Sequence, residues 1–325
     1  MQMSFLTRVF GLLLFAAAAF PASAQPYPNR PLRLIVPYPA GGQPDTVARI
    51  VSKQMSLALG QPINVDNIGG GSGIPAIIAL TGARPDGHTL IVMDAGHWAI
   101  SPAARSTPVP YDPVKSFTPV GLVTTSSLFI AVNEAVAATS LAELVSLVRQ
   151  KPGALNYGSA GIGSVHHLTI EALKQALGLD MVHVPFRGTS QSVPALVGGQ
   201  VQVVVATLGG LVQFEKAGRI RILAANTIGR SALAPTVPSV SEVAPNLDFP
   251  GQVGLFGPAG MPKDVVDRLS AAVEDAMKSP EVLAALKVGG VEPAPARNPE
   301  ALARRIQDDR ARYGALIKAT GIQLE

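Results

Sequence analysis

The chain has 325 residues, of which 47% are hydrophobic and 15% charged, with a formal net charge of +4 at pH 7. This length predicts about two domains. The composition excludes a disordered, collagen-like or coiled-coil protein. The basic residues are spread thinly along the chain, so they give no reason to expect a nucleic-acid partner. Because cysteine is absent, disulfides, thiolate metal sites, iron–sulfur clusters, cysteine nucleophiles and an acylated lipoprotein anchor are excluded.

Residues 1–24 have the pattern of a secretory signal peptide. A single positive charge at Arg8 precedes an apolar run from Val9 to Phe20, and Ala22-Ser23-Ala24 supplies the small residues that favour cleavage. The apolar run is shorter than the roughly 20 residues that a membrane-spanning helix needs. We therefore expect cleavage before Gln25 and export without a lipid anchor, to the periplasm if the host has an outer membrane.

After this segment, short β-branched runs alternate with amphipathic helical patterns. This alternation predicts βαβ units and a mostly parallel sheet. In chain order it predicts a strand at Leu32–Val36, a helix with Asp45 as its N-cap and Gly60 as its stop, a strand near Ile63–Val65, a helix from Ile74 and a strand at Thr89–Met93.

A second series of the same kind follows. It predicts strands near Leu128–Asn133, Leu155–Tyr157, Met181–Val184, Val201–Ala206 and Arg221–Ala225, with helices from a capping box at Ser140 to Arg149 and from Ser164 to Leu177. A proline-rich connection, Ala234–Pro250, leads back to a strand at Val253–Gly257 and three helices near Lys263–Lys278, Glu281–Val288 and Pro299–Ala319. We therefore expect two α/β lobes joined by two crossings, with residues 25–125 and 250–325 in lobe 1 and residues 126–249, return connection included, in lobe 2.

Three predicted strand-to-helix loops are rich in glycine: Ala40–Asp45, Gly69–Gly73 and Gly158–Ser164. Glycine lets the backbone approach a ligand closely, and the N–H groups at a helix start carry partial positive charge. Such loops can bind a carboxylate or phosphate without Arg or Lys. Any one of them could equally be a tight turn that needs glycine for steric reasons. Three loops at equivalent strand ends, with the hydroxyls of Ser159 and Ser164, favour a small-anion site.

The usual catalytic patterns are missing. The chain has no G-x-S-x-G, G-x-x-x-x-G-K-[ST] or intact G-x-G-x-x-G motif, and no H-E-x-x-H. His166 and His167 would point about 100° apart on a helix, so we expect one to be packed or capping and the other exposed. Ser164 and His167 could form a hydrogen bond, but a serine at a helix start is usually a cap. We expect no catalytic residue, no metal and no cofactor.

A set of motifs in fixed order resembles the Bug-type receptors of tripartite tricarboxylate transporters. The motifs are Tyr27-Pro-Asn-Arg-Pro31, Val36-Pro-Tyr-Pro-Ala-Gly-Gly-Gln-Pro-Asp45, Pro85-Asp-Gly-His-Thr-Leu90, Tyr111-Asp-Pro113, Leu155-Asn-Tyr-Gly-Ser-Ala-Gly-Ile-Gly-Ser164, His183-Val-Pro-Phe-Arg-Gly188, Gly198-Gly-Gln-Val201 and Pro258-Ala-Gly-Met-Pro262. The resemblance, from Pro26 to Ile322, implies a two-lobed, Venus-flytrap solute-binding protein with the type II-like periplasmic-binding-protein architecture. It also implies capture of a small organic acid for a membrane permease, and we expect a monomer.

The resemblance also implies which residues hold the ligand carboxylate through amides and hydroxyls: Ala40, Gly41 and Gly42 in lobe 1, and Ser159, Ala160, Gly161, Gly163 and Ser164 in lobe 2. Three departures from the family pattern add further residues to the expected site. Gln43 and Pro44 replace a small or hydroxyl-bearing pair. Asp94, Ala95, His97 and Trp98 stand where small hydroxyl residues are common, and Ala206-Thr207 stands where the family often has Asp. Gln43, Asp94, Ala95, Trp98 and Thr207 therefore join the expected site.

Two questions stay open at this point. Trp98 could stack on the ring of an aromatic carboxylate, or it could pack within lobe 1 while the ligand is an aliphatic di- or tricarboxylate. The alternative to a receptor is a secreted α/β enzyme that uses Ser164, His167 or Asp94 on a small carboxylate. A receptor could also deliver its ligand to a sensor protein instead of a permease.

Overall fold

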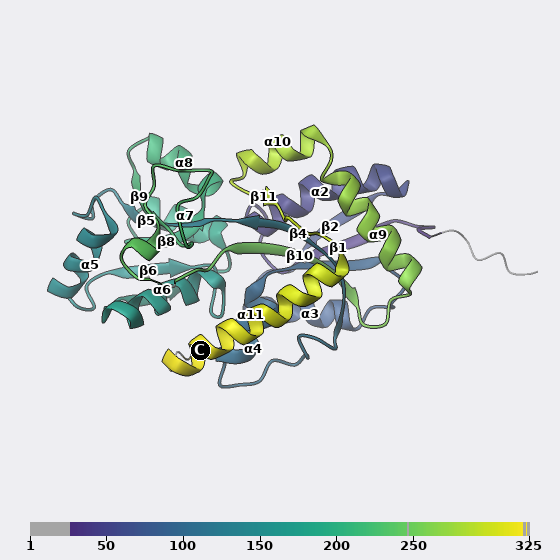
Figure 1. Ribbon diagram of the computed structural model, residues 1–325, viewed down its shortest axis with the longest axis horizontal. Coiled ribbons are helices and arrows are strands. Elements are labelled where there is room, and N and C mark those ends of the chain that lie inside the picture. Colours follow the sequence, from purple (N-terminus) through teal and green to yellow (C-terminus); the bar gives the residue numbers. More distant parts are fainter. Residues whose placement is uncertain (1–26, 246, 321–322, 324–325) are drawn as a thin grey trace, which may run out of the picture.

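The computed structural model describes residues 27–245, 247–320 and 323, so the predicted signal peptide lies outside the described residues. Two lobes lie side by side, each built around its own β-sheet with helices packed on it (Figure 1). No helix among the described residues is long and apolar enough to cross a bilayer.

Lobe 1 contains a six-stranded sheet in the order β11-β4-β10-β3-β1-β2. Its strands are β1 (Leu32–Val36), β2 (Ile63–Asn67), β3 (Thr89–Met93), β4 (Phe117–Ser126), β10 (Gly251–Pro258) and β11 (Glu292–Pro293). Its helices are α2 (Gln43–Leu59), α3 (Ile74–Thr81), α4 (Ser101–Ala104), α9 (Lys263–Ala276), α10 (Pro280–Val288) and α11 (Pro299–Thr320), with short helical turns η1 (Gly71–Gly73) and η2 (Gly96–Ile100). β3 is buried along its apolar run from Leu90 to Met93, and β1 is buried except at Arg33, as expected of inner parallel strands.

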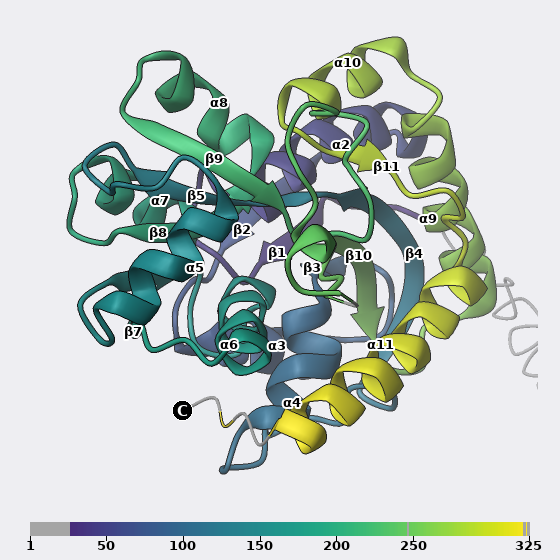
Figure 2. The same ribbon diagram turned by 60° about the vertical axis from the view of Figure 1, so that its left-hand side comes forward.

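Lobe 2 contains a five-stranded sheet in the order β7-β6-β8-β5-β9. Its strands are β5 (Leu128–Asn133), β6 (Asn156–Ser159), β7 (Val182–Pro185), β8 (Val203–Thr207) and β9 (Ile220–Ala225). Its helices are α5 (Leu141–Gln150), α6 (Val165–Leu177), α7 (Thr189–Val197) and α8 (Leu208–Lys216), with a short turn η3 (Val240–Glu242). Figure 2 shows α8 of this lobe facing α10 of lobe 1.

The expected two α/β lobes are confirmed, but the prediction of mostly parallel sheets is wrong. β1 pairs in parallel with β2 and β3, whereas β10 runs antiparallel to both β3 and β4. β5 likewise runs antiparallel to β8 and β9. The physical reason is the double crossing: β4 leads out of lobe 1 and β10 returns to it, so neighbouring strands at the crossing run in opposite directions. β4 ends at Ser126 and β10 begins at Gly251, and the lobe boundaries after residues 125 and 249 stay a prediction.

Asn226 joins the two crossings in the buried interior. Its side-chain Oδ1 accepts a hydrogen bond from Leu128 N–H at 3.0 Å, and its Nδ2 donates to Phe249 O at 2.7 Å. Nδ2 also lies 3.2 Å from Thr169 Oγ1 on α6. The fully buried amide of Asn226 thus connects β5, the returning segment and α6 by hydrogen bonds, directly beside the two crossings.

Two local predictions are wrong. The N-cap of α2 is Gly42, and Asp45 lies in the first turn, where it accepts hydrogen bonds from Gly41 N–H and from Asn67 Nδ2. His166 and His167 are both buried, because α6 packs against lobe 2 on one side and faces lobe 1 on the other. The predicted caps at Gly60 and Ser164 are confirmed. Ser140 caps its helix as predicted, but the capping box is incomplete because the Glu143 carboxylate accepts from Thr139 N–H instead of Ser140 N–H.

Stacked aromatic rings lie under the glycine-rich loop of lobe 2. The rings of His167 and His183 stack with centroids 3.7 Å apart, and Tyr157 stacks on His183 at 4.9 Å. Ser159 Oγ lies 2.7 Å from His183 Nε2. Burial lowers the pKa of His167 to about 3 and that of His183 to about 4, so both rings are neutral at physiological pH.

We expect the unfolding midpoint to fall as the pH drops from about 7 to about 5. Both histidines have depressed pKa values in the folded state, so the unfolded chain binds more protons below its ordinary histidine pKa of about 6.5, and stability is lost as the pH falls below that value. Thermal unfolding at several pH values checks this. His183→Gln removes one of the proton-binding groups and should flatten the pH dependence, whereas an unchanged slope would contradict the expectation.

Candidate functional site

The cleft between the lobes contains a central cavity lined by both of them and by the returning strand. Its wall consists of Tyr38, Gly42, Gln43, Pro44, Asp94 and Ala95 from lobe 1, Ala160, Val165, His166, Gly188 and Thr189 from lobe 2, and Pro250, Gly251 and Gln252 beside the crossing. With the lobes in contact the cavity volume is about 10 Å³, about the space that one water molecule needs. A larger solute can therefore enter only when the lobes move apart.

Two helix N-termini reach this cavity from opposite sides. α2 begins after Gly42 in lobe 1, and α6 begins after its N-cap Ser164 in lobe 2. The first residues of both helices line the wall. Because unpaired N–H groups give each helix start a partial positive charge, the two lobes present a favourable field to one anion when they close.

The glycine-loop amides fall into two groups. The N–H groups of Gly41, Gly161 and Gly163 are used within the chain, since they donate to Asp45 Oδ2, Ser159 Oγ and His167 Nδ1. Within the described residues, the N–H groups of Gly42 and Ala160 donate to no protein acceptor, and both residues line the cavity. A bound anion can therefore be held by one free amide from each lobe.

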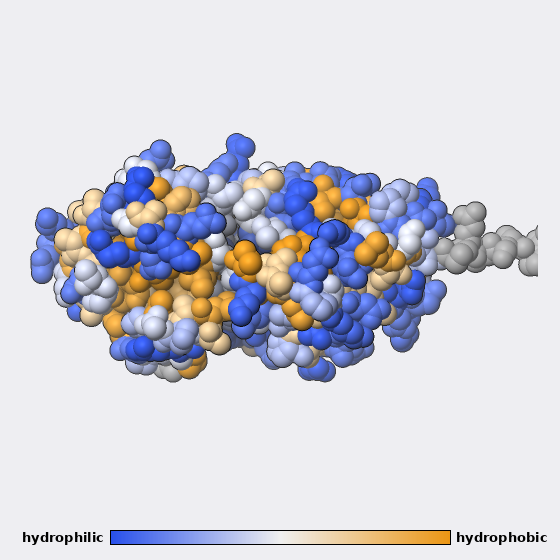
Figure 3. All heavy atoms as spheres, turned by 90° about the horizontal axis from the view of Figure 1, so that it is seen from above, coloured by the Kyte–Doolittle hydropathy of each residue, from blue (hydrophilic) through white to orange (hydrophobic). Residues whose placement is uncertain are grey.

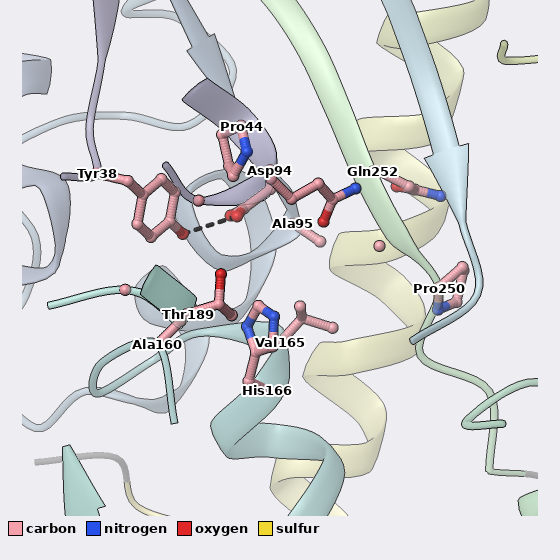
Figure 4. A pocket seen from close by; sticks show the side chains of 14 residues that line it. Tyr38, Pro44, Asp94, Ala95, Ala160, Val165, His166, Thr189, Pro250 and Gln252 are labelled. Carbon is pink, nitrogen blue, oxygen red and sulfur yellow. Dashed lines mark hydrogen bonds between the residues drawn. The ribbon is translucent and has the colours of Figure 1, made fainter. Parts of the chain in front are cut away.

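Asp94 places a buried carboxylate in the wall of the cavity, at the carboxyl end of β3. Its Oδ1 accepts hydrogen bonds from Gly96 N–H and His97 Nδ1, both at 2.9 Å, and its Oδ2 accepts one from Tyr38 OH at 2.7 Å (Figure 4). Burial by itself raises the pKa of Asp94, but the contacts with His97 and Tyr38 outweigh it and hold the pKa below its usual value. The residue is therefore an ionised acceptor facing the cleft.

His166 and Gln252 also line the cavity, and neither is among the site residues expected from the sequence. His166 Nδ1 and Gln252 Oε1 are buried without a hydrogen-bond partner among the described residues. Burial lowers the pKa of His166 to about 4, so its ring is neutral. Figure 4 shows His166 and Thr189 of lobe 2 pointing toward Asp94, with Gln252 further to the side on the returning strand. Unpartnered polar atoms in a cavity wall are suited to a bound solute.

The expected site residues lie along the whole cleft rather than at one point. Gly42, Gln43, Asp94, Ala95 and Ala160 line the central cavity. Gly41 and Thr207 line a wider hollow beside it of about 430 Å³, Gly161 lines another of about 390 Å³, and Gly163 and Ser164 line a small one. Ala40, Trp98 and Ser159 line none of these four.

Trp98 lies in the core of lobe 1. It is fully buried in η2, its indole Nε1 donates to Asp309 Oδ2 at 3.0 Å, and its ring packs against Phe256 at 5.7 Å between centroids. Its polar edge and its faces are therefore occupied by protein atoms. This position agrees with the packing alternative for Trp98 and gives it no surface toward the cleft.

Serine–histidine chemistry has no suitable geometry among the described residues. Ser164 Oγ accepts from His167 N–H and donates to Gly161 O, which is the arrangement of a helix cap. Ser159 Oγ contacts His183, but Ser159 is fully buried and lines none of the four cavities described above. Neither hydroxyl is both activated by a base and accessible, as a nucleophile must be.

Glycines lie where the lobes meet. A Cβ at Gly209 of α8 would stand 2.5 Å from the backbone carbonyl of Gly289 in lobe 1, and one at Gly96 would stand 3.1 Å from Gly163 O in lobe 2. Ser72 of lobe 1 donates from its hydroxyl to Ile162 O of lobe 2 at 3.0 Å. Seen from the side of α8 and α10, hydrophobic residues gather on lobe 2 beside this junction, within a largely hydrophilic surface (Figure 3).

Comparisons with known proteins agree on one family. Residues 47–322 match the family model described as "Tripartite tricarboxylate transporter family receptor". A "UPF0065 protein in tcbD-tcbE intergenic region" of Pseudomonas sp. (strain P51) is 33% identical over 293 residues, covering 90% of this chain and 86% of the relative. The solved structure of MatC from Rhodopseudomonas palustris with bound malate has a TM-score of 0.85 and 32% identity, covering 90% of this chain and 100% of that one. The structure of R. palustris Rpa4515 with adipate has a TM-score of 0.87 and 30% identity, covering 91% and 99%.

We expect Gly209→Ala to disfavour the closed arrangement without unfolding either lobe. The added methyl would overlap the backbone of Gly289 across the cleft, a clash that costs about 1–3 kcal/mol in the closed state only, or roughly a 5- to 150-fold shift toward open lobes. Small-angle X-ray scattering should give a larger radius of gyration than for the wild type.

The matched control is Gly210→Ala in the same helix, where the new methyl would lie 3.8 Å from its nearest neighbour. It should behave like the wild type. Equal scattering from Gly209→Ala and Gly210→Ala, with unchanged circular dichroism, would show that this contact does not limit closure.

Proposed function

The chain belongs to the tripartite tricarboxylate transporter receptor family, and on that premise we propose that its central cavity captures a small organic acid for the membrane permease of such a transporter. The family match confirms the resemblance found in the sequence, and the similarity to the solved structure of the periplasmic binding protein BugD confirms the two-lobed fold. The chain is therefore a solute-binding receptor, and the identity of its solute is the subject of the proposal.

The observation that carries the proposal is the convergence of two helix N-termini, one from each lobe, on one small cavity. A carboxylate placed between the free amides of Gly42 and Ala160 interacts with both lobes at once. These contacts are complete only when the lobes close around the acid, with the cavity wider than in this structure, so the acid stabilises a closed state by differential binding. A permease can then recognise the closed form.

The relatives support the same chemical class. MatC is described with malate and Rpa4515 with adipate, and both compounds are small aliphatic carboxylates. Because Trp98 packs inside lobe 1, it supplies no stacking surface for an aromatic ring. Of the two ligand classes left open by the sequence, we therefore propose an aliphatic acid.

The remaining parts of the proposal concern the location and partners of the receptor. We propose that the protein works as a periplasmic monomer after cleavage before Gln25, and that it binds its ligand without changing it. The matched family model describes receptors and one solved relative is described as "periplasmic binding protein BugD", and the buried or capping serines supply no nucleophile. Turnover of a bound acid that is lost in Ser164→Ala would instead favour the enzyme alternative.

A thermal-shift screen with aliphatic mono-, di- and tricarboxylates on residues 25–325 tests the proposed function. We expect at least one acid to raise the unfolding midpoint in a concentration-dependent way, because a ligand that binds only the folded state adds RT ln(1 + [L]/Kd) to its stability. Calorimetry should then give one acid per chain, and chromatography should recover it unchanged. Absence of any response to these acids, and to acids that also carry an amino or amide group, would overturn the proposal.

Arg187 is expected to speed capture rather than to hold the ligand. It is exposed and lines the hollow beside the central cavity, together with Gly71 and Gly161. A cation at the mouth steers anions toward the cleft, and salt screens this effect. We expect Arg187→Gln to lower the association rate of the bound acid several-fold at low ionic strength and little at high ionic strength.

Stopped-flow measurements of the association rate check this, with Arg304→Gln as the control because Arg304 is exposed on α11 and lines none of the four cavities. An equal loss of rate in both variants would mean that only the overall charge matters. No loss in Arg187→Gln would remove the steering role.

A further inference from the structure

We propose that the acid selected by this receptor carries an N–H donor, as an amino or carboxamide group, which binds Asp94 and Gln252 in the cavity wall. This inference rests on the proposed function, because it assigns the second functional group of the captured acid. It starts from a chemical imbalance: the site must hold an anion, yet the charged side chain in the wall of its central cavity is a carboxylate.

The carboxylate of Asp94 can accept one more hydrogen bond. Its Oδ1 already accepts from Gly96 N–H and His97 Nδ1, whereas its Oδ2 accepts from Tyr38 OH. An ionised carboxylate offers about two acceptor positions on each oxygen, so Oδ2 keeps one of them. Because Asp94 is buried and lines the cavity, a group on the ligand is well placed to fill that position.

Gln252 supplies a second acceptor. Its Oε1 is buried without a partner among the described residues, although its side chain lines the same cavity. An unsatisfied buried acceptor costs stability until a donor reaches it. Because Asp94 and Gln252 line the same cavity, a ligand group that enters between the lobes can approach both acceptors.

These two acceptors select among ligand groups. An ammonium or a primary amide has at least two N–H donors and can satisfy both, whereas a hydroxyl has one. A second carboxylate has none and would place oxygen lone pairs against the ionised Asp94, without a Lys or Arg in the described cavity wall to compensate. It could bond Gln252 only if that amide turned its NH₂ group inward. His166 Nδ1 can donate or accept according to its tautomer, so it does not oppose this selection.

The test compares acids that differ in one group. For chain lengths from four to six carbons, the affinity of each α,ω-diacid is measured by calorimetry against that of its monoamide, and aspartate is measured against succinate to test an ammonium. The monoamide has the same shape as the diacid, but NH₂ replaces one oxygen. We expect at least one N–H-bearing acid to bind at least ten times more tightly than the matching diacid.

Two variants locate the effect. Asp94→Asn gives the wall a donor of its own and should reduce or reverse the preference at least tenfold. Gln252→Met removes the second acceptor and should weaken the N–H-bearing acid several-fold, with little effect on the diacid. Asp66→Asn is the matched control, because Asp66 pairs with Arg33 on the exposed edge strand β2, and it should leave the preference unchanged.

The outcomes separate the two proposals. Binding of diacids at least as tightly as their N–H-bearing partners at every length, or a preference unaffected by both cleft variants, would overturn the inference while leaving a carboxylate receptor in place. Absence of binding by all of these acids and by the wider carboxylate panel would overturn the proposed function itself. If Asp94→Asn does not fold, Gln252→Met decides the question through the same ratio of affinities.

Discussion

Burial of an ionised carboxylate at the end of β3 is the constraint on which the cleft depends. Asp94 is held by Tyr38 OH, by Gly96 N–H and by His97, and the chain must turn tightly after β3 to bring the last two donors around it. The resulting π-helical turn, η2, leaves no room for a side chain at Gly96, where a Cβ would stand 2.9 Å from Asp94 Oδ1 and 3.1 Å from Gly163 O across the cleft. The missing side chain at Gly96 therefore makes room for the Asp94 carboxylate and also lets lobe 2 come close.

The same turn connects the cavity to the long C-terminal helix. Trp98 follows in η2 and donates to Asp309 on α11, which also pairs with Arg305 at 2.7 Å. Further along α11, Tyr313 stacks on Phe249 at 5.9 Å, and Phe249 is bonded to Asn226 at the crossings. A continuous set of buried contacts thus runs from the cavity wall through α11 to the point where the chain passes between the lobes.

The sequence predicted those parts of the fold whose signals are local. Apolar β-branched runs located most strands, but the crossing strand β4 was missed, since Pro119 interrupts its pattern. α7 and α8 were missed because Pro194 and the Gly209-Gly210 pair usually break helices. Asp94 was found because it departs from a family pattern. His166 and Gln252 could not be found, because their unpartnered atoms exist only once both lobes and the returning strand come together.

Closure of the lobes and recognition of the ligand depend on different parts of this molecule. The lobes meet through backbone and glycine, whereas side chains recognise the ligand. Where Gly209 meets Gly289 and Gly96 meets Gly163, there are no side chains whose conformations must be fixed when the lobes close. These contacts also do not depend on which ligand is bound. Recognition is left to the few side chains in the cavity wall. Substitutions in the cavity wall can therefore change the ligand over evolutionary time. The shape of the closed receptor, and with it the surface that its transporter recognises, stays the same.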